Sequence, residues 1–134
     1  MMKTRHWEET MSHKILVVDD DILVLEALEE LLKSSGYEVR IAMRGQEALE
    51  ILEKERFDLL ILDVVMPKMT GFDLCCEVRK RDDEMSRVKI IMLTAKTDAR
   101  NAEVRKECGC DLYLTKPIDP DRLKELIRNT LEGT

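Results

Sequence analysis

The chain has 134 residues, a length that suits one domain built around a single hydrophobic core. Its 28 acidic and 22 basic side chains give a net charge of −6, and the basic residues are scattered, which argues against direct binding of nucleic acid. No apolar run approaches the roughly 20 residues of a membrane span, and the first residues lack the apolar stretch of a signal peptide, so we expect a cytoplasmic protein without a membrane partner.

The first residues show no apolar period. We therefore expect residues 1–13 to form a mobile leader and residues 14–132 to form the domain. Met11 opens a stretch that resembles a natural start of translation, which makes it an alternative first residue.

Five apolar runs of strand length recur along the chain. Their near-continuous Ile, Leu and Val content is typical of strands in a parallel sheet that helices cover on both faces. The runs lie at residues 14–18, 37–42, 58–62, 88–93 and 111–115.

Between the runs, apolar residues recur three and four positions apart, as on the buried face of a helix. The stripes are Val24, Ala27, Leu28, Leu31 and Leu32; then Ala48, Leu49 and Leu52; then Leu123, Leu126, Ile127 and Leu131. The first helix is predicted to end at Ser35-Gly36 and the last to open at Asp119-Pro120. Alternating strands and helices of this kind predict a flavodoxin-like (βα)5 three-layer α/β sandwich with a parallel five-stranded sheet of order 2-1-3-4-5.

Polar residues of particular types follow the ends of four strands. The first strand runs into Asp19 and Asp20, the third into Asp63, the fourth into Thr94 and the fifth into Lys116. Each alone has an ordinary explanation as a helix cap, strand end or surface charge. Together they meet at the carboxyl edge of the sheet, where three carboxylates require a cation. Oxygen ligands of this kind suit Mg²⁺, for which we expect Mn²⁺ to substitute.

A carboxylate, a divalent cation, a hydroxyl and an ammonium group are also what phosphoryl transfer to an aspartate requires. The carboxylate attacks phosphorus, and the positive groups stabilise the phosphoryl oxygens. The sequence contains neither GxxxxGK[ST] nor GxGxxG, so the phosphoryl group is expected to arrive already activated on another molecule.

Four segments resemble the response-regulator receiver domain of two-component signalling, of the single-domain chemotaxis or phosphorelay type. They are ILVVDDD, LLILDVVMPKMTGFDL, IIMLTAK and GCDLYLTKP, in the order of the family. The resemblance implies that Asp63 is the phosphoacceptor. It also implies that Asp19, Asp20, Asp63 and the backbone carbonyl of Val65 bind the metal, with Asp20 in direct contact.

The resemblance further implies a signalling switch. Thr94 would bond to the new phosphoryl group, Lys116 would pair with it, and Lys116-Pro117 would be a cis peptide. Tyr113 stands at the aromatic switch position, and the signal would leave through the helix after the fourth strand, the fifth strand and the last helix. The implied partners are a histidine kinase or histidine phosphotransfer protein and an unknown downstream protein.

Two features are particular to this sequence. Val65 cannot orient a water molecule, and its bulk next to the phosphoacceptor predicts slow autodephosphorylation; Lys96 stands at the other variable position, two residues after Thr94. Ile22 and Leu25 fall off the expected apolar stripe of the first helix. We expect them to face solvent and to form a docking patch for a helical phosphodonor, although exposed apolar residues are common without a function.

The four cysteines form an adjacent pair, Cys75 and Cys76, and a CGC at Cys108 to Cys110. Neither spacing is the usual two-residue gap of a zinc or redox motif. A metal or disulfide site stays open as an alternative, but we expect reduced thiols.

Three functions remain to be compared. The leading one is a phosphorylation-activated switch that catalyses only its own phosphorylation and dephosphorylation. Thr134 stands close behind the last helix, so protein contact or phosphorelay would carry its output unless the sequence is a fragment of a longer chain. A second is a haloacid-dehalogenase-like phosphatase with Asp19 as nucleophile and Asp21 completing D-x-D, although Leu23 stands where that motif has Thr or Val. A third is a receiver-like interaction module that is never phosphorylated.

Overall fold

The structure is a computed structural model that describes residues 13–95 and 109–133. Its centre is a parallel five-stranded sheet of order β2-β1-β3-β4-β5, as the alternation of elements predicts. The strands are β1 (Lys14–Val18), β2 (Glu38–Ala42), β3 (Leu59–Leu62), β4 (Lys89–Ala95) and β5 (Leu112–Lys116). The predicted leader lies outside the described residues except for His13.

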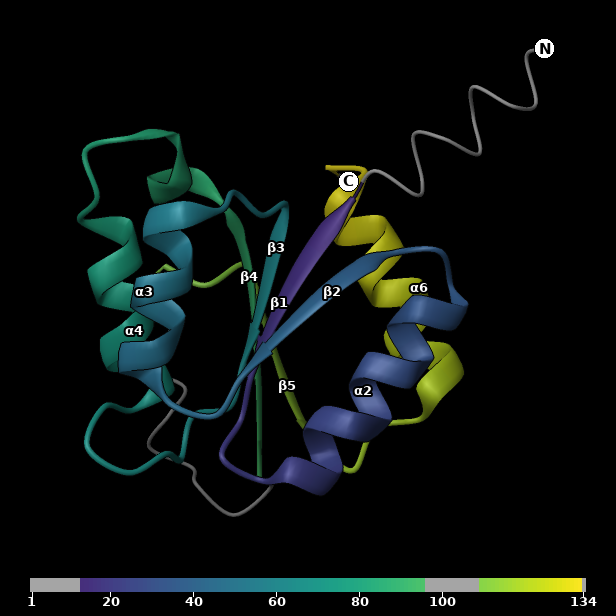
Figure 1. Ribbon diagram of the computed structural model, residues 1–134. Coiled ribbons are helices and arrows are strands. Elements are labelled where there is room, and N and C mark those ends of the chain that lie inside the picture. The colour runs from purple at the N-terminus through teal and green to yellow at the C-terminus, as the bar shows by residue number, and fades with distance from the viewer. Residues whose placement is uncertain (1–12, 96–108, 134) are drawn as a thin grey trace, which may run out of the picture.

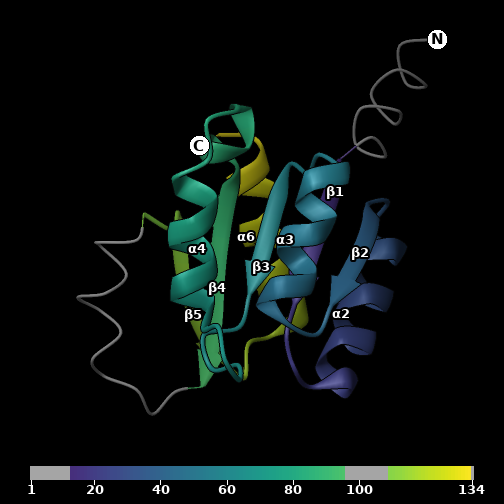
Figure 2. The same cartoon turned by 60° about the vertical axis from the view of Figure 1, so that its left-hand side comes forward.

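Helices cover both faces of the sheet (Figure 1). They are α2 (Ile22–Ser34), α3 (Gly45–Lys54), α4 (Gly71–Arg79) and α6 (Pro120–Leu131), with a short 3₁₀ helix η1 (Glu84–Arg87). α3 and α4 lie on one face, and α2 and α6 lie on the other (Figures 1 and 2). The helix expected after the fourth strand falls among residues 96–108, outside the described residues. In the described part of the chain, no helix is long and apolar enough to cross a membrane.

The core is divided by the sheet into two clusters. Alternate side chains of the central strands point to opposite faces, so Leu16 and Leu60 pack toward α3 and α4 while Ile15 and Leu59 pack toward α2 and α6. All four residues of β3 are buried, which explains why the sequence of this strand is continuously apolar.

The buried face of α2 differs from the predicted stripe. Leu25, Leu28 and Leu32 are buried, whereas Ala27 is exposed. The prediction that Leu25 faces solvent is therefore wrong, because its side chain is 0% exposed and belongs to the core cluster on the α6 side of the sheet. This helix is apolar over most of its circumference, so several stripes of helical spacing fit the sequence and only packing on the sheet selects one.

Local signals at the helix ends agree with the structure. Asp21 is the N-cap of α2, where its carboxylate accepts a hydrogen bond of 3.0 Å from the Leu23 amide. Asp119 caps α6 in the same way, and Pro120 occupies its first turn. At the other end of α2, the helix stops at Ser35, and Gly36 follows with φ of 96°.

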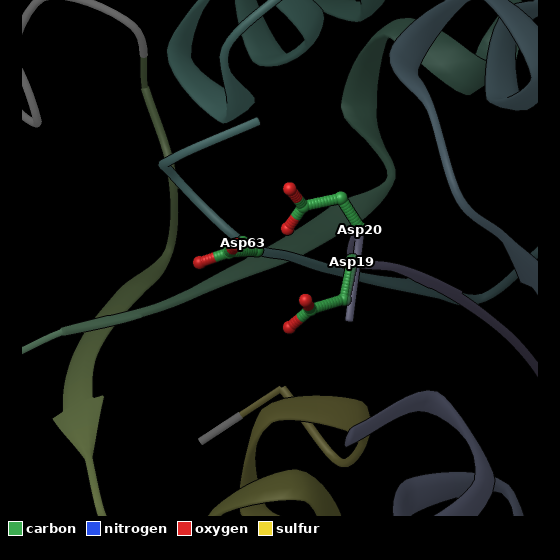
Figure 3. A group of neighbouring side chains, drawn as sticks. All are labelled: Asp19, Asp20 and Asp63. Atoms are coloured by element: carbon green, nitrogen blue, oxygen red, sulfur yellow. The ribbon is translucent and has the colours of Figure 1, made fainter. Parts of the chain in front are cut away.

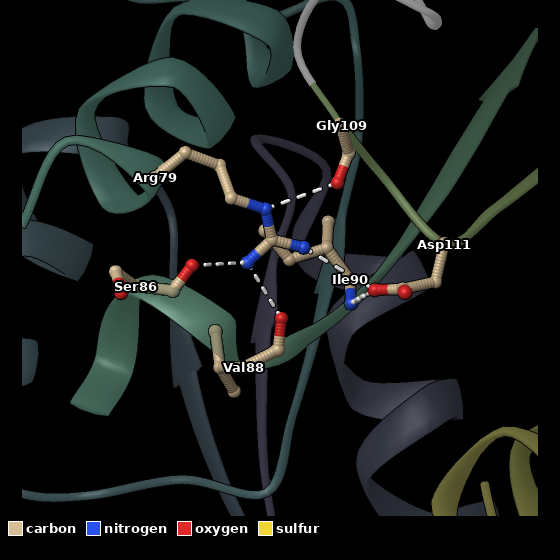
Figure 4. A network of polar contacts seen from close by, with 6 residues as sticks. All are labelled: Arg79, Ser86, Val88, Ile90, Gly109 and Asp111. Carbon is tan, nitrogen blue, oxygen red and sulfur yellow. Dashed lines mark hydrogen bonds and ion pairs between the residues drawn. The ribbon is translucent and has the colours of Figure 1, made fainter.

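The edge of the sheet opposite these aspartates is held by Arg79 at the end of α4 (Figure 4). Its guanidinium donates hydrogen bonds to the carbonyls of Gly109, Ser86 and Val88 at 3.0, 3.0 and 2.7 Å, and contacts Asp111 at 3.2 Å. Asp111 also accepts a 2.8 Å hydrogen bond from the Ile90 amide, which joins the starts of β4 and β5. This network ties the start of β5 to α4 and β4, at the end of the strand away from Lys116.

Candidate functional site

Three carboxylates meet where β1 and β3 end. Asp19 and Asp20 follow β1, and Asp63 follows the neighbouring strand β3. One oxygen from each of the three lies within 4.8 Å of the others, and their side chains extend to the same side of the sheet edge (Figure 3). Asp19 and Asp63 are buried, whereas Asp20 is exposed.

Backbone hydrogen bonds hold the two buried aspartates. The Asp19 amide donates to the Ala42 carbonyl at 3.1 Å, and the Asp63 amide donates to the Val18 carbonyl at 2.9 Å, so the sheet ladder continues one residue beyond each strand. The Asp21 amide donates to Asp19 Oδ1 at 2.9 Å. Asp21 therefore contributes an amide to the site, while its own carboxylate caps α2.

Lys116 brings a cation to this cluster from the end of β5. Its Nζ lies 2.9 Å from Asp19 Oδ2 and 3.6 Å from Asp63 Oδ1. Burial acts to lower the pKa of Lys116, but the hydrogen bond to Asp19 and the charges of Asp19 and Asp63 outweigh it, so the pKa is raised. Lys116 is therefore fully charged at neutral pH.

Asp63 is the most perturbed acid of the cluster. Burial, and then the charge of Asp19, raise its pKa to about 6, against the opposing effect of Lys116 and of a hydrogen bond from the Val65 amide. One ammonium group faces three carboxylates, so the ionised site keeps a charge of −2. Such a site favours a further cation.

The donor set fits a small divalent cation. Carboxylate oxygens are the ligands that Mg²⁺ and Mn²⁺ prefer, and Asp20 is exposed, so that water or a phosphoryl oxygen could complete the coordination. Within residues 13–95 and 109–133, no other group of three or more His, Cys, Asp or Glu side chains is arranged to hold a metal ion. Metal ligation by the Val65 carbonyl stays a prediction.

Thr94 and Tyr113 lie on adjacent strands behind this edge. Thr94 is fully buried, and its Oγ1 has no hydrogen-bond partner among the described residues. A buried hydroxyl without a partner costs about 1–3 kcal/mol, a cost that an incoming acceptor would remove. Tyr113 is half-buried, and the Lys116-Pro117 peptide is cis, as the resemblance implies. Lys96 lies outside the described residues.

The loop after Asp63 is closed by Gly71, the first residue of α4. A Cβ at this position would lie 2.3 Å from the Asp63 carbonyl oxygen, so only glycine permits this approach. Gly71 lies in the segment LLILDVVMPKMTGFDL, which resembles the receiver family, but no local pattern shows its contact, because Gly71 and Asp63 are not neighbours in the chain.

Exposed apolar side chains surround the acidic site. Those of Ile22, Leu23, Met43 and Val65 are 44%, 72%, 40% and 60% exposed, and all four follow the carboxyl ends of strands β1, β2 and β3. Ile22 faces solvent as predicted. The second exposed apolar side chain of this helix is Leu23 and not Leu25, which was expected there. The available signal for Leu23 was its position on the side of α2 opposite Leu25, Leu28 and Leu32, so a buried stripe that includes Leu25 would have indicated its exposure.

A groove of about 720 Å³ runs beside the site between α2 and the start of α6. Its walls are mostly apolar, including Val24, Leu31, Ile118 and Leu123, and Lys116 and Pro117 stand at the end next to the carboxylates. The groove and the exposed residues of α2 thus border the charged cluster.

Comparison with known proteins agrees with this geometry. A family model described as the response regulator receiver domain matches residues 15–128. The chain is 44% identical over 126 residues to the probable transcriptional regulator ycf27 of Cyanophora paradoxa, a match that covers 94% of this chain and 51% of that protein. The chain spans about half the length of the curated relatives that it matches.

Solved structures share the fold over nearly the whole chain. The signal receiver domain of a histidine kinase from Syntrophus aciditrophicus superposes with a TM-score of 0.85 at 33% identity, covering 92% of each chain. The receiver domain of the sensor histidine kinase PA1611 from Pseudomonas aeruginosa PAO1 has a TM-score of 0.82 at 28% identity, covering 90% of this chain and 98% of that one. That structure carries a magnesium ion in its active-site cleft.

Proposed function

Because the chain belongs to the response regulator receiver domain family, we propose that it is a phosphorylation switch in which Asp63 accepts a phosphoryl group from a phosphohistidine. One observation carries the proposal. Asp19, Asp20 and Asp63 present oxygens within 4.8 Å of one another, and the Lys116 ammonium touches two of the three. This arrangement offers a nucleophile, oxygen ligands for a divalent cation and a positive group for the transferred phosphoryl oxygens.

In the proposed reaction, a carboxylate oxygen of Asp63 attacks phosphorus and forms the new P–O bond. The P–N bond to the donor histidine breaks, and the leaving imidazole nitrogen keeps the electron pair and takes up a proton. Bound Mg²⁺, or Mn²⁺ in its place, would neutralise charge on the phosphoryl oxygens, held by Asp19, Asp20, Asp63 and the Val65 carbonyl. Lys116 would pair with the phosphoryl group, and the unpartnered Thr94 hydroxyl would donate a hydrogen bond to it.

The output of the switch is proposed to depend on Thr94 and Tyr113. When Thr94 Oγ1 turns toward the phosphoryl group, its side chain leaves a space next to β5. The Tyr113 ring then moves into that space. The signal then leaves through β5, α6 and the preceding segment toward a downstream protein. The helix expected in that segment lies outside the described residues.

The proposed phosphodonor is a histidine kinase or a histidine phosphotransfer protein. Ile22 and Leu23 project beside Asp20, and the groove between α2 and α6 opens next to Lys116. An amphipathic helix of the donor could cover these apolar surfaces while its histidine reaches Asp63. Leu25 takes no part in this surface, since it is buried.

The test is incubation with acetyl phosphate and Mg²⁺, followed by intact-mass measurement. We expect wild type to gain one phosphoryl group and Asp63→Asn to gain none. Asp121→Asn, on the exposed surface of α6, is the matched control and should be labelled like wild type. Acetyl phosphate needs no docking, so this result does not depend on the identity of the donor protein.

Other outcomes would support other functions. Label that disappears with Asp19→Asn but persists with Asp63→Asn would indicate a phosphatase-like nucleophile at Asp19. Wild type that acquires no label with Mg²⁺ or Mn²⁺ would indicate an interaction module that is not phosphorylated. Hydrolysis of added phosphate esters with turnover would contradict the proposal that the chain catalyses only its own phosphorylation and dephosphorylation.

A further inference from the structure

The aromatic ring of Tyr113 lies against another ring. The Phe72 and Tyr113 centroids are 6.4 Å apart and their planes differ by 10°, which is an offset stack. Phe72 comes from the first turn of α4, and α4 covers β4 and β5 on this face of the sheet (Figure 2). Phe72 is 9% exposed, and Tyr113 packs against the same core cluster.

Hydrogen bonds hold the backbone on both sides of Phe72. The amide of Gly71 donates a hydrogen bond of 2.9 Å to the Val64 carbonyl, and the Gly71 Cα packs directly on the Asp63 carbonyl. A capping box then fixes the first turn of α4: the Asp73 amide donates to Thr70 Oγ1 at 3.1 Å, and the Thr70 amide donates to Asp73 Oδ2 at 3.0 Å.

These contacts form a continuous path from the backbone of Asp63 through Gly71 and Phe72 to the ring of Tyr113. The path does not include Thr94, which lies on the neighbouring strand β4 opposite Thr115, two residues beyond Met92, the register partner of Tyr113. A shift of the Asp63–Val64 backbone would move Gly71, and Phe72, which is 9% exposed and stacked on Tyr113, would pass the movement to β5.

We propose that Phe72 is a positioning residue that holds the Tyr113 ring and couples it to Asp63. The inference rests on the proposed function, because it assigns a regulatory contact to the same site. In this role Phe72 acts through Tyr113 and supplies no ligand or charge to the acidic site, because its side chain is a hydrocarbon ring. Its replacement should therefore spare phosphorylation and change only the response of Tyr113.

The test follows the Tyr113 ring directly by ¹⁹F NMR after incorporation of 3-fluorotyrosine. The chain has two tyrosines, so Tyr37→Phe assigns the Tyr113 resonance. Spectra of wild type and Phe72→Leu are compared before and after acetyl phosphate and Mg²⁺, with intact mass measuring phosphorylation of each sample. If Phe72→Leu does not fold, Phe72→Met takes its place.

Two further variants separate the stack from general loss of core packing. Phe57→Leu makes the same chemical change at another buried residue of the same core cluster, which is 3% exposed. Phe57 precedes β3 and so lies at the amino ends of the strands, away from the acidic site. Phe72→Tyr keeps an aromatic face against Tyr113.

We expect Phe72→Leu to be phosphorylated as fully as wild type. Before phosphorylation, the ¹⁹F chemical shift of its Tyr113 should move toward the value of unfolded protein. The change in that chemical shift on phosphorylation should be mostly lost. Phe57→Leu and Phe72→Tyr should behave like wild type. The inference fails if Phe72→Leu keeps the wild-type resonance and shift, or if Phe57→Leu disturbs Tyr113 equally. Absence of label in wild type would instead refute the proposed function, while the resonance before phosphorylation would still test the stack.

Discussion

At Asp63, burial and the charge of Asp19 make the stability of the fold depend on pH. The carboxyl pKa is about 6 in the folded chain, against roughly 3.9 in an unfolded one. The folded state therefore binds this proton more tightly, and the stabilising contribution of the protonated group is lost as pH rises from about 4 to about 6. The total change is on the order of 3 kcal/mol in the absence of a divalent cation.

Asp63→Asn removes this titration. Without a divalent cation at pH 7.5, its free energy of unfolding should exceed that of wild type by up to about 3 kcal/mol, and the difference should shrink toward zero near pH 4. Urea denaturation at several pH values measures it. Asp121→Asn should show no such pH-dependent difference. If Asp63→Asn changed the free energy of unfolding equally at pH 4 and pH 7.5, the raised pKa of Asp63 would be contradicted.

Val65 governs access to the phosphorylated aspartate in the proposed function. Its side chain is 60% exposed beside Asp63, where it can exclude a water molecule but cannot orient one. Val65→Asn supplies a polar group there and should speed loss of the phosphoryl group by on the order of tenfold, below the roughly 100-fold or more of general-base catalysis, because an amide orients water without taking up its proton. Intact mass after removal of acetyl phosphate measures the decay. Met43→Asn, another exposed apolar residue of the site rim, should leave the rate unchanged.

At the scale of the element, the leucines of α2 differ in burial according to the face of the helix on which they lie. Leu25 is fully buried against the sheet, while Leu23 is 72% exposed beside the acidic site. One face of the helix is thus buried against the sheet, and the other is exposed where the proposed phosphodonor would bind. Its N-terminus is fixed by the Asp21 cap, so the exposed residues hold a constant position relative to Asp20.

Leu25→Ala and Leu23→Ala test this division. Leu25→Ala should lower the free energy of unfolding by about 2–5 kcal/mol, because it leaves a cavity in the core. Leu23→Ala should change it by less than about 0.5 kcal/mol, as surface substitutions usually do. Chemical denaturation of both variants measures their free energies of unfolding. Equal stability losses would mean that the two side chains are not buried differently.

At the scale of the whole molecule, the excess negative charge of the site predicts that a divalent cation would stabilise the fold. A cation that binds only the folded state stabilises it by about 2.7 kcal/mol at 100 times its Kd. Mg²⁺ should therefore raise the thermal midpoint of wild type at pH 7.5.

Asp20→Ala should abolish this rise and also Mg²⁺-dependent phosphorylation, because Asp20 is exposed and serves the cation site without supporting the core. Asp21→Ala is the control. It should lower the midpoint through loss of the helix cap, by about 1 kcal/mol of stability, but keep the full response to Mg²⁺. Calorimetry with and without Mg²⁺ measures both, and an intact Mg²⁺ response in Asp20→Ala would exclude Asp20 as a ligand.

The sequence alone determined the strands, the sheet order and the carboxyl-edge residues Asp19, Asp20, Asp63, Thr94 and Lys116. It could do so because apolar periodicity and helix caps are local properties, and because parallel strands bring their ends to one edge whatever their side chains. The capping role of Asp21 and the start of α6 at Pro120 were predictable for the same reason.

Only the tertiary structure decided which face of α2 is buried. It shows that Leu23 is exposed and that Leu25 is buried, whereas the sequence had led us to expect Leu25 on the exposed side. It also decided that Lys116 lies closer to Asp19 than to Asp63, that Gly71 touches the Asp63 carbonyl and that Phe72 stacks on Tyr113. These contacts join residues on different elements. Their distances depend on how helices pack on the sheet, and packing depends on the shapes of all the side chains between them, which no local pattern records.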